Sequence, residues 1–527
     1  MFTRIHSATV IGVDSSIIEI EVDLKKGLPQ QTIVGLPDTA VKEAKERVNS
    51  AVRNSGFVFP LGKLTINLAP ADIRKEGSIF DLGIAVGILI VSGQIETQKN
   101  IEEYVIVGEL SLDGYIRPVH GILAILETVK TIGIQKILMP YENYSEASMI
   151  SGVRIQAVRY LSDAVGLISG SQYTVYPESE NRVSVTTVFQ KRKAAVKKTQ
   201  ADSVDFSEVK GQTHAVRGVE VAASGGHNVL LIGSPGSGKT MIASRIPTIL
   251  PGLTEEESIE TTKIYSIAGY FPENSGLMEK RPFRAPHHTA SEIAIIGGGK
   301  NPIPGEITLA HNGVLFMDEF SEFKQNIIQS LRQPMETGMI SISRADFRLI
   351  FPADFMLVAS MNPCPCGYLF DPDRKCQCSI SQIRKYYMKI SGPILDRIDI
   401  QIEVKPLKLA EIVTEKTALS SASIKKRVMG ARNIQKSRLS RHGITLNSQM
   451  NGVLVKRYCV LNQSSKNLMS RAVKEYHLSA RAYFKILKVA RTIADIEGRE
   501  SLREEDLLDA LSYREVEDIL YREPKIP

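Results

Sequence analysis

The residues best suited to chemistry lie near the middle of the chain, in the stretch GSPGSGKT at 233–240. An apolar run at 229–232 precedes it and a helical pattern at 241–249 follows, which predicts a strand, a glycine-rich turn and a helix start. Glycines let backbone amides wrap a polyphosphate, Lys239 reaches the β- and γ-phosphates, and the Thr240 hydroxyl can hold Mg²⁺. The predicted nucleotide-binding residues are Gly233, Ser234, Pro235, Gly236, Ser237, Gly238, Lys239 and Thr240.

Two further apolar strands end in polar side chains. The first, GVLFMDEF at 313–320, ends in Asp318, which can coordinate Mg²⁺, and Glu319, which can polarise a water for attack on the γ-phosphate. The second, at 355–360, leads to Asn362, whose amide can orient that water. Because ligands of parallel sheets bind at the carboxyl ends of the strands, these residues predict a nucleotide hydrolase that uses ATP and Mg²⁺.

Four of the five cysteines lie within fifteen residues, in the hairpin 364–378. Cys364, Cys366, Cys376 and Cys378 form two C-x-C pairs separated by nine residues, and four thiolates can close a tetrahedral Zn²⁺ site. A metal-free loop and redox chemistry remain alternatives. The isolated Cys459 is expected to be a buried apolar residue.

The N-terminal region, 1–178, has the alternation of an α/β domain, with expected strands at 16–22 and 63–68 and an expected helix at 38–55. Its segments 75–93 and 108–130 resemble the proteolytic domain of Lon proteases, which uses a serine and a lysine. Asp81 stands at the position of the serine and Leu123 at that of the lysine, and no base is evident for Ser78. The resemblance therefore implies a degenerate, non-proteolytic domain used for docking or assembly.

The region from the glycine-rich turn onward resembles AAA+ ATPases. That resemblance implies that Asn362 is sensor 1, that Arg397 in SGPILDRIDI is an arginine finger given to a neighbouring subunit, and that Arg481 is sensor 2. Arg481 would then reach the nucleotide from a helical lid. The expected catalytic residues are Glu319, Asn362, Arg397 and Arg481, and a finger acting between subunits implies a ring.

Nearly the full chain resembles the magnesium chelatase-like family of competence proteins and their YifB relatives, through RPFRAPHHT, GVLFMDEF, SMNPCPCGY and SGPILDRIDI in that order. The resemblance implies a homo-hexameric ATPase that binds DNA and drives branch migration or helicase activity when incoming DNA recombines during natural transformation. Recombination proteins are then expected partners. A protein-remodelling AAA+ chaperone and a true magnesium chelatase subunit are the alternatives.

Several basic residues are candidates for holding a phosphate backbone. The net charge is only +7, but 423–442 carries seven Lys or Arg residues and no acidic one, which suits a polyanion or a solvated helix face. Two insertions, 280–313 and the alternating hairpin at 339–352, offer Lys300, Arg344 and Arg348 to DNA or to a subunit contact. His287 and His288 lack an evident third ligand and are expected to make polar contacts.

The fold class expected is α/β: an AAA+ P-loop ATPase core with a helical lid, preceded by the degenerate Lon-protease-like domain. The expected boundaries are 1–178 for that domain, 179–201 for a basic linker, 202–410 for the ATPase core and 411–527 for the lid. The N-terminus lacks the apolar core of a signal peptide, and no apolar run is long enough to span a bilayer. A cytoplasmic protein without a membrane partner is predicted.

Overall fold

The computed structural model describes residues 1–75, 77–96, 100–171, 204–270, 276–299, 302–344, 347–371, 373–390, 392–406, 419–476 and 478–514. They form two compact units. The first unit is built from 1–199 with 258–278, and the second from 200–257 with 279–527. The expected linker at 179–201 and an expected helix at 409–417 lie outside the described residues.

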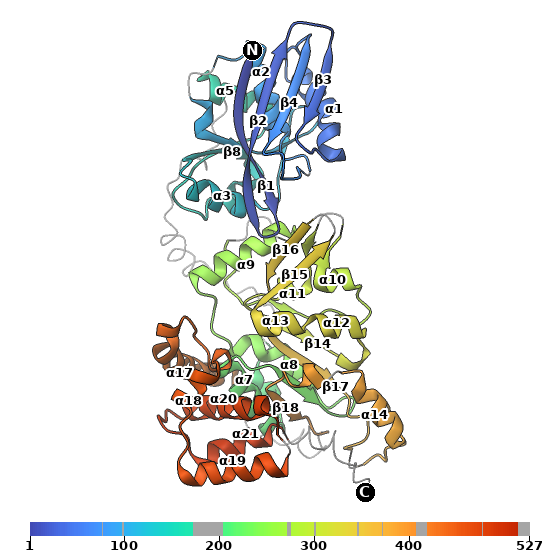
Figure 1. Cartoon of the computed structure of the whole chain (residues 1–527), viewed down its shortest axis with the longest axis vertical. Helices are drawn as coiled ribbons and strands as arrows, with labels where there is room; N and C mark the ends of the chain where they lie inside the picture. The colour runs from blue at the N-terminus through green and yellow to red at the C-terminus, as the bar shows by residue number, and fades with distance from the viewer. Residues whose placement is uncertain are drawn as a thin grey trace. The chain divides into compact units, whose positions relative to one another are not determined.

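The first unit is organised by a seven-stranded mixed sheet with the order β3-β4-β2-β1-β5-β8-β9 (Figure 1). β1 and β2 pair antiparallel from Phe2 opposite Asp23 to Ile11 opposite Asp14, whereas β5, β8 and β9 run parallel to one another. The expected strands at 16–22 and 63–68 lie within β2 and β4, so both are confirmed. The strands are β1 (Phe2–Ile11), β2 (Asp14–Lys25), β3 (Gln30–Val34), β4 (Lys63–Ala69), β5 (Tyr104–Ile106), β8 (Lys136–Pro140) and β9 (Arg154–Val158), with the small pair β6 (Glu109–Leu110) and β7 (Ile116–Arg117).

The central helix of this unit, α2 (Asp81–Val91), is apolar on all sides and buried, as expected for a helix enclosed by a core. It lies close to β2, since a Cβ at Gly83 or Gly87 would come within 2.7 Å of Ile20 or Val22. The expected helix with an acidic cap is confirmed as α1, whose first turn is capped by Asp38. The helices are α1 (Thr39–Asn54), α2, α3 (Ile122–Thr131), α4 (Tyr144–Ala147), α5 (Leu161–Ser169) and α9 (Glu255–Ile267), which belongs to this unit from Ser258.

A parallel five-stranded sheet with the order β11-β14-β17-β10-β18 organises the second unit, which confirms the predicted parallel sheet (Figure 1). Because all five strands run in the same direction, their carboxyl ends share one edge and their amino ends share the other. The strands are β11 (Phe283–Arg284), β14 (Val314–Met317), β17 (Met356–Met361), β10 (Val229–Ile232) and β18 (Ile400–Glu403).

Helices and two hairpins surround this sheet. The alternating segment before Asn362 forms the antiparallel pair β15 (Met339–Arg344) and β16 (Phe347–Pro352), so the expected hairpin is confirmed. A shorter pair, β12 (Gly297–Gly298) and β13 (Ile303–Pro304), lies in the other insertion. The helices are α7 (Thr213–Gly225), α8 (Lys239–Ile249), α10 (Glu292–Ile296), α11 (Glu306–Leu309), α12 (Gln325–Ser330), α13 (Arg332–Thr337), α14 (Ile380–Met388) and α15 (Gly392–Leu395).

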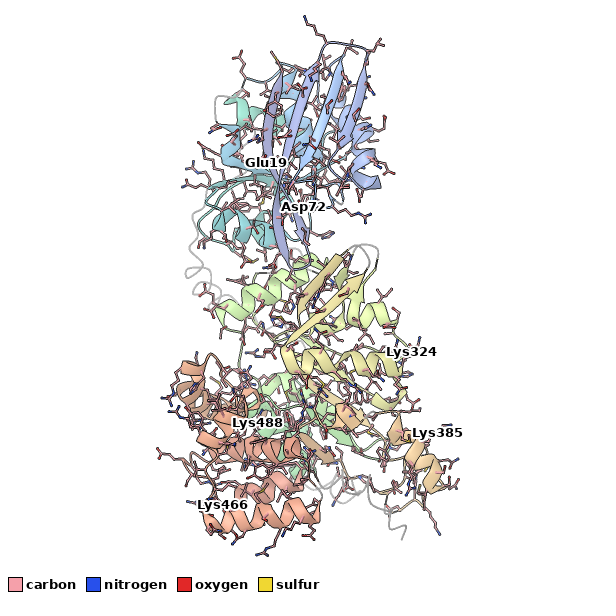
Figure 2. The ribbon with its side chains drawn as sticks, in the orientation of Figure 1. Glu19, Asp72, Lys324, Lys385, Lys466 and Lys488 are labelled. Atoms are coloured by element: carbon pink, nitrogen blue, oxygen red, sulfur yellow. The ribbon has the colours of Figure 1, made fainter. Side chains whose placement is uncertain are left out.

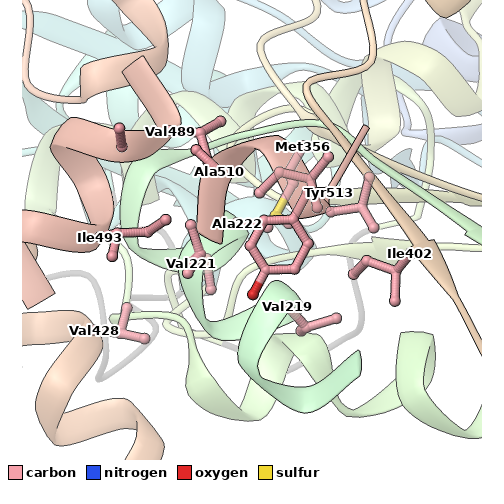
Figure 3. Packing of buried hydrophobic residues seen from close by; sticks show 14 of the residues in the cluster. Val219, Val221, Ala222, Met356, Ile402, Val428, Val489, Ile493, Ala510 and Tyr513 are labelled. Carbon is pink, nitrogen blue, oxygen red and sulfur yellow. The ribbon is translucent and has the colours of Figure 1, made fainter. Parts of the chain in front are cut away.

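The C-terminal part is helical, as predicted. Its helices are α17 (Ser421–Leu439), α18 (Gly452–Tyr458), α19 (Gln463–Glu475), α20 (Ala480–Ile496) and α21 (Glu504–Ser512). They share one apolar core with the parallel sheet, which includes Ile493 and Ala510 of these helices, Val221 of α7 and Ile402 of β18 (Figure 3). Cys459 is buried in this core, which confirms the expectation for it.

The basic segment 423–442 is less of a polyanion surface than its sequence suggests. Arg432 donates to the Ala223 carbonyl, Arg438 pairs with the buried Asp495, and Arg427 pairs with Glu220. These guanidinium groups attach α17 to its neighbours, so the interpretation of 423–442 as a uniformly solvated basic face is wrong. Four of its seven basic side chains remain exposed, namely Lys426, Arg427, Lys436 and Arg441.

Charged side chains elsewhere extend outward, for example Lys324, Lys385 and Lys466 (Figure 2). Within the described ranges, no helix combines the length and apolar character needed to cross a bilayer.

The ion pair of Arg47 and Asp81 gives the first stability prediction. Arg47 donates to both carboxylate oxygens of Asp81 at 2.8 and 3.1 Å, and Asp81 is 1% exposed. Burial raises the pKa of Asp81 to about 6 although Arg47 opposes this shift. We expect Arg47→Met to destabilise the first unit by about 3 kcal/mol at pH 7, because a buried carboxylate loses its partner.

The pH dependence of this loss follows from the raised pKa of Asp81. A carboxyl whose folded pKa exceeds its unfolded value loses stability as pH rises through the folded pKa, and removing Arg47 raises that pKa further. The destabilisation by Arg47→Met should therefore be about 1.4 kcal/mol smaller at pH 5 than at pH 7 in thermal unfolding. Arg53→Met, an exposed arginine of the same helix, is the control, and an equal loss at both pH values would contradict the prediction.

Candidate nucleotide-hydrolysis site

The stretch 233–240 connects the carboxyl end of β10 to the start of α8, as the sequence predicts. Gly236 and Gly238 adopt left-handed backbone conformations with φ of 79° and 97°, which favour glycine. A Cβ at Gly233 would lie 2.2 Å from the Val404 carbonyl oxygen, so that position also requires glycine. The loop ends at the N-terminus of α8, where backbone amides and the helix dipole favour an anion.

Lys239 is 9% exposed and reaches back over this loop. Its Nζ donates to the carbonyl oxygens of Gly233 and Ser234 at 2.7 and 3.0 Å and to Oδ1 of Asn362 at 3.2 Å. Burial lowers the pKa of Lys239, while the negative charges of Asp318 and Glu319 oppose the shift. The structure therefore brings the predicted loop lysine into contact with the predicted sensor 1 amide.

Thr240 and Asp318 also meet. The Thr240 hydroxyl donates to Oδ2 of Asp318 at 2.8 Å, and the Glu319 amide donates to Oδ1 at 3.0 Å. The buried Ser360 hydroxyl donates to the same carboxylate. A hydroxyl beside a carboxylate is an oxygen donor set that suits Mg²⁺, so these residues fit the expected ion.

Sequence reasoning did not select Ser360. A signal was present, because it is a small polar residue in the otherwise apolar strand β17 and lies two residues before Asn362. The structure brings both residues to the site, since the Ser360 hydroxyl donates to Asp318 and the Asn362 Oδ1 accepts from Lys239.

Glu319 lies two residues after the end of β14 in a left-handed conformation with φ of 51°, which is uncommon for a residue other than glycine. Its Oε2 lies 3.2 Å from Nδ1 of His288. His287 Nδ1 contacts the Thr289 hydroxyl at 2.8 Å, so the two histidines make polar contacts, as expected.

Arg397 and Arg481 lie elsewhere in the second unit, where both donate to the carboxylate of Glu336. Arg397 precedes β18, and its neighbour Asp399 accepts from the Asn228 amide at the amino end of β10. The arginines are thus at the amino edge of the sheet. The four residues of β10, a length of about 13 Å, separate this edge from the phosphate loop. The structure does not bring Arg481 to the nucleotide loop of its own chain, contrary to the expectation of a lid arginine closing over it.

The four clustered cysteines converge. Their sulfurs all lie within 4.8 Å of one another, with Cys364 3.3 Å from Cys366 and 3.7 Å from Cys376, and Cys366 3.6 Å from Cys376. Sulfurs bound tetrahedrally to zinc at about 2.3 Å would be about 3.8 Å apart, so the cluster fits structural Zn²⁺. The free cysteines form no disulfide in the described residues.

The hairpin 364–378 contacts the phosphate loop. Gly367 has φ of 86°, and a Cβ there would lie 2.7 Å from Cδ of Pro235. On its other side, the Tyr387 hydroxyl of α14 donates to the Pro363 carbonyl at 2.7 Å. The cysteine hairpin therefore supports both Asn362 and the loop.

The residues proposed to face DNA are only partly described. Lys300 lies outside the described residues, and Arg344 is described only as part of β15. Arg348 of β16 is exposed.

Asp81 and Leu123 hold the positions of the Lon serine and lysine, and the structure describes both. Leu123 is fully buried in an apolar cluster, and Asp81 is engaged by Arg47. The Ser78 hydroxyl donates to Glu109, a partner that sequence reasoning missed, but Arg117 binds the same carboxylate at 3.3 Å. An ion-paired carboxylate is a poor base, so Glu109 is a weak candidate for activating Ser78.

Comparisons with known proteins agree with this architecture. Models of the magnesium chelatase subunit ChlI match residues 20–143 and 205–412, and the model of the ChlI C-terminal region matches 418–514. The uncharacterized protein YifB of Salmonella typhimurium is 40% identical over 528 residues, covering 99% of both chains. The competence protein ComM of Haemophilus influenzae is 40% identical over 520 residues, covering 98% of both.

The chain belongs to the magnesium chelatase ChlI-like family. Membership of this AAA family implies an ATPase that uses ATP and Mg²⁺. Lon protease 2 of Bacillus subtilis is 24% identical over 179 residues, which cover 31% of this chain and 32% of that protease. This match confirms the resemblance to Lon proteases that the N-terminal motifs indicate.

The cysteine cluster leads to a prediction that zinc analysis can check. Cys376→Ser should lower bound zinc from about one per chain to almost none, because three thiolates no longer close the tetrahedron. Since the hairpin supports Pro235 through Gly367, the KM for ATP should rise several-fold. Cys459→Ser, the same change at a cysteine outside the cluster, should keep its zinc, and wild-type protein free of zinc would refute the assignment.

Proposed function

We propose that the protein is a ring-forming ATPase that couples ATP hydrolysis to DNA remodelling, with branch migration or helicase activity during recombination of incoming DNA. The observation that supports this most is the division of the site between two edges of one sheet. The phosphate loop, Asp318, Glu319 and Asn362 are at the carboxyl edge, and Arg397 and Arg481 are at the amino edge. Such a site is complete only when two copies meet.

Each residue at the carboxyl edge has a role that follows from its position. Lys239 leaves the loop carbonyls for the β- and γ-phosphates, since a phosphate is a stronger acceptor than a neutral carbonyl. Thr240 and Asp318 hold Mg²⁺, which neutralises charge that develops on the phosphates. Glu319 polarises the attacking water, and Asn362 orients it from the adjacent strand.

The arginines act on the neighbouring subunit. Glu336 binds both guanidinium groups, and Arg481 with Arg397 lowers the pKa of that carboxyl, which keeps it anionic. A carboxylate that holds two arginines together occupies the place that the γ-phosphate of the neighbouring subunit would take. Arg397 is then the finger, and Arg481 assists it from the lid of the same subunit.

DNA is proposed as the polymer acted upon because the relative from Haemophilus influenzae is named a competence protein. The exposed Arg348 of the β15–β16 hairpin, together with Lys426 and Lys436 of α17, offers cations to a phosphate backbone. A homo-hexamer, a cytoplasmic location and contact with recombination proteins follow from the same proposal.

The first test is ATP turnover against a panel of DNA structures and an unfolded protein. Forked or four-way DNA should stimulate turnover several-fold, and the stimulation should fall steeply with salt because phosphate contacts release counterions. Stimulation by the unfolded protein alone would favour a chaperone, and insertion of Mg²⁺ into a porphyrin would favour a chelatase subunit. In the same assay Glu319→Gln should bind ATP but hydrolyse it at least 100-fold more slowly.

The second test examines whether the arginines act between subunits. Arg397→Ala and Lys239→Ala should each be nearly inactive, the first for lack of a finger and the second for lack of a working loop. An equal mixture should recover about a quarter of wild-type turnover, because one random interface in four pairs an intact loop with an intact finger. Mixing Arg397→Ala with a variant that carries both Lys239→Ala and Arg397→Ala should recover no turnover, because no subunit then has a finger. Activity of Arg397→Ala alone would contradict the assignment.

A further inference from the structure

The helical segment 419–474 carries charged side chains of a single sign. It contains twelve Lys or Arg residues and no Asp or Glu, whereas the net charge of the whole chain is only +7. Acidic groups from outside the segment neutralise part of this charge, since Glu220 pairs with Arg427 and Asp495 pairs with Arg438. Basic side chains gathered in one region are typical of a surface that binds a polyanion, so the cations without acidic partners identify where one can bind.

Basic side chains from two parts of this segment meet at Tyr458, the last residue of α18. Arg441 donates from Nη2 to the Tyr458 hydroxyl at 2.6 Å, and His442 Nε2 lies 3.1 Å from the same oxygen. Both residues belong to the turn Ser440–His442 that follows α17. The Arg457 guanidinium lies 5.6 Å from the centroid of the tyrosine ring, within the range of a cation–π contact. Because the ring packs against the apolar core of the second unit, it positions these cations.

The groups that hold these cations leave their charge available. A phenol hydroxyl and an aromatic ring orient a guanidinium without neutralising it, whereas a carboxylate cancels its charge. Arg438 shows the contrast, because its guanidinium also lies near the ring but donates to Asp495 at 2.8 Å. Arg441, Lys456 and Arg457 are exposed, and none of them forms an ion pair with a described residue. Three cations that keep their charge therefore lie at the end of α18 and in the turn after α17.

We propose that Arg441, Lys456 and Arg457, together with Tyr458, form a cluster that binds the phosphate backbone of DNA. This inference deepens the proposed function and rests on it, because it names one place where the second unit holds the DNA. A guanidinium can donate two hydrogen bonds to one phosphate, and an ammonium attracts a phosphate as a point charge. Such contacts are made to the backbone and not to the bases, which suits a motor that acts on any sequence.

Binding of labelled duplex DNA to the full-length protein, measured by fluorescence anisotropy over a range of salt concentrations, tests this inference. In a variant that carries both Arg441→Gln and Arg457→Gln, the Kd should rise about ten-fold near physiological salt. The slope of log Kd against log salt should fall by about two, because each lost phosphate contact no longer releases a counterion. A variant with Arg441→Lys and Arg457→Lys keeps both charges, so it should retain the slope and lose only the bidentate hydrogen bonds.

Tyr458→Phe distinguishes an organised cluster from a diffuse basic surface. It removes the hydroxyl that orients Arg441 and His442 but leaves the net charge unchanged. The Kd should rise about three-fold, as for the loss of one hydrogen bond, while the salt slope keeps its wild-type value. A Kd equal to that of the wild-type protein would overturn the inference.

The matched control removes two exposed charges from α14 by Arg384→Gln and Lys385→Gln. It should leave the Kd and the salt slope nearly unchanged, because these side chains do not belong to the cluster. An equal loss of affinity in this control would overturn the inference, since net charge alone would then explain the binding. Cluster variants that lose binding to polyglutamate but not to DNA would also overturn it, because an acidic protein would then be the partner.

Thermal unfolding establishes which variants are folded. Lys456→Gln, a change at an exposed side chain, keeps the inference testable if the variants at Arg441 or Tyr458 do not fold. It should lower the salt slope by about one, and an unchanged slope in this variant would overturn the inference.

The same measurements separate this inference from the function on which it rests. A wild-type protein that binds no DNA would refute both. Wild-type binding with an unchanged Kd and slope in the Arg441→Gln and Arg457→Gln variant would overturn only the role of the cluster. Loss of affinity in that variant, without any stimulation of wild-type ATP turnover by DNA, would support the cluster and refute the coupling of hydrolysis to DNA.

Discussion

The parallel pairing of β10 with both β17 and β18 is the constraint on which the rest of the site depends. Pairing with β17 places Met361 beside Ile232, so Asn362 emerges next to the phosphate loop. Pairing with β18 places Ile400 beside Val229, so Arg397 emerges at the opposite edge. One register therefore brings the proposed hydrolytic residues together and keeps the two proposed arginines away from them, which is why the proposed function requires a second copy of the chain.

A buried polar network connects the arginine edge to the helical part of the second unit. Burial alone would raise the pKa of Asp399, but Lys485 at 2.8 Å and His227 at 3.6 Å outweigh it and hold that pKa well below its usual range. Lys485 lies one helical turn after Arg481, and Asp399 lies two residues after Arg397. The buried pair thus sets the spacing of the two arginines, and movement of α20 must move both.

Features that depend on local sequence could be predicted, including the glycine-rich loop, the strands before Asp318 and Asn362, the hairpin before β17 and the convergence of the cysteines. Each rests on spacing along one segment. Contacts between distant segments could not be predicted, because a single sequence does not show which charged side chains meet in the fold. Glu336 joins arginines 61 and 145 residues away, and three arginines of α17 that looked like a DNA surface instead bind groups inside the second unit.

The phosphate loop is held from two sides, and the two supports differ physically. On the sheet side, Gly233 packs on the Val404 carbonyl, a contact fixed by backbone pairing and insensitive to ligands. On the other side, Pro235 packs on Gly367 of the hairpin that carries the four clustered cysteines. Because a metal supplies folding energy to such a hairpin, the geometry of Asn362 and Pro235 should follow the state of the four thiolates. In the proposed function, the cysteine cluster thus supports the hydrolytic residues through Gly367, which lies against Pro235 and Asn362.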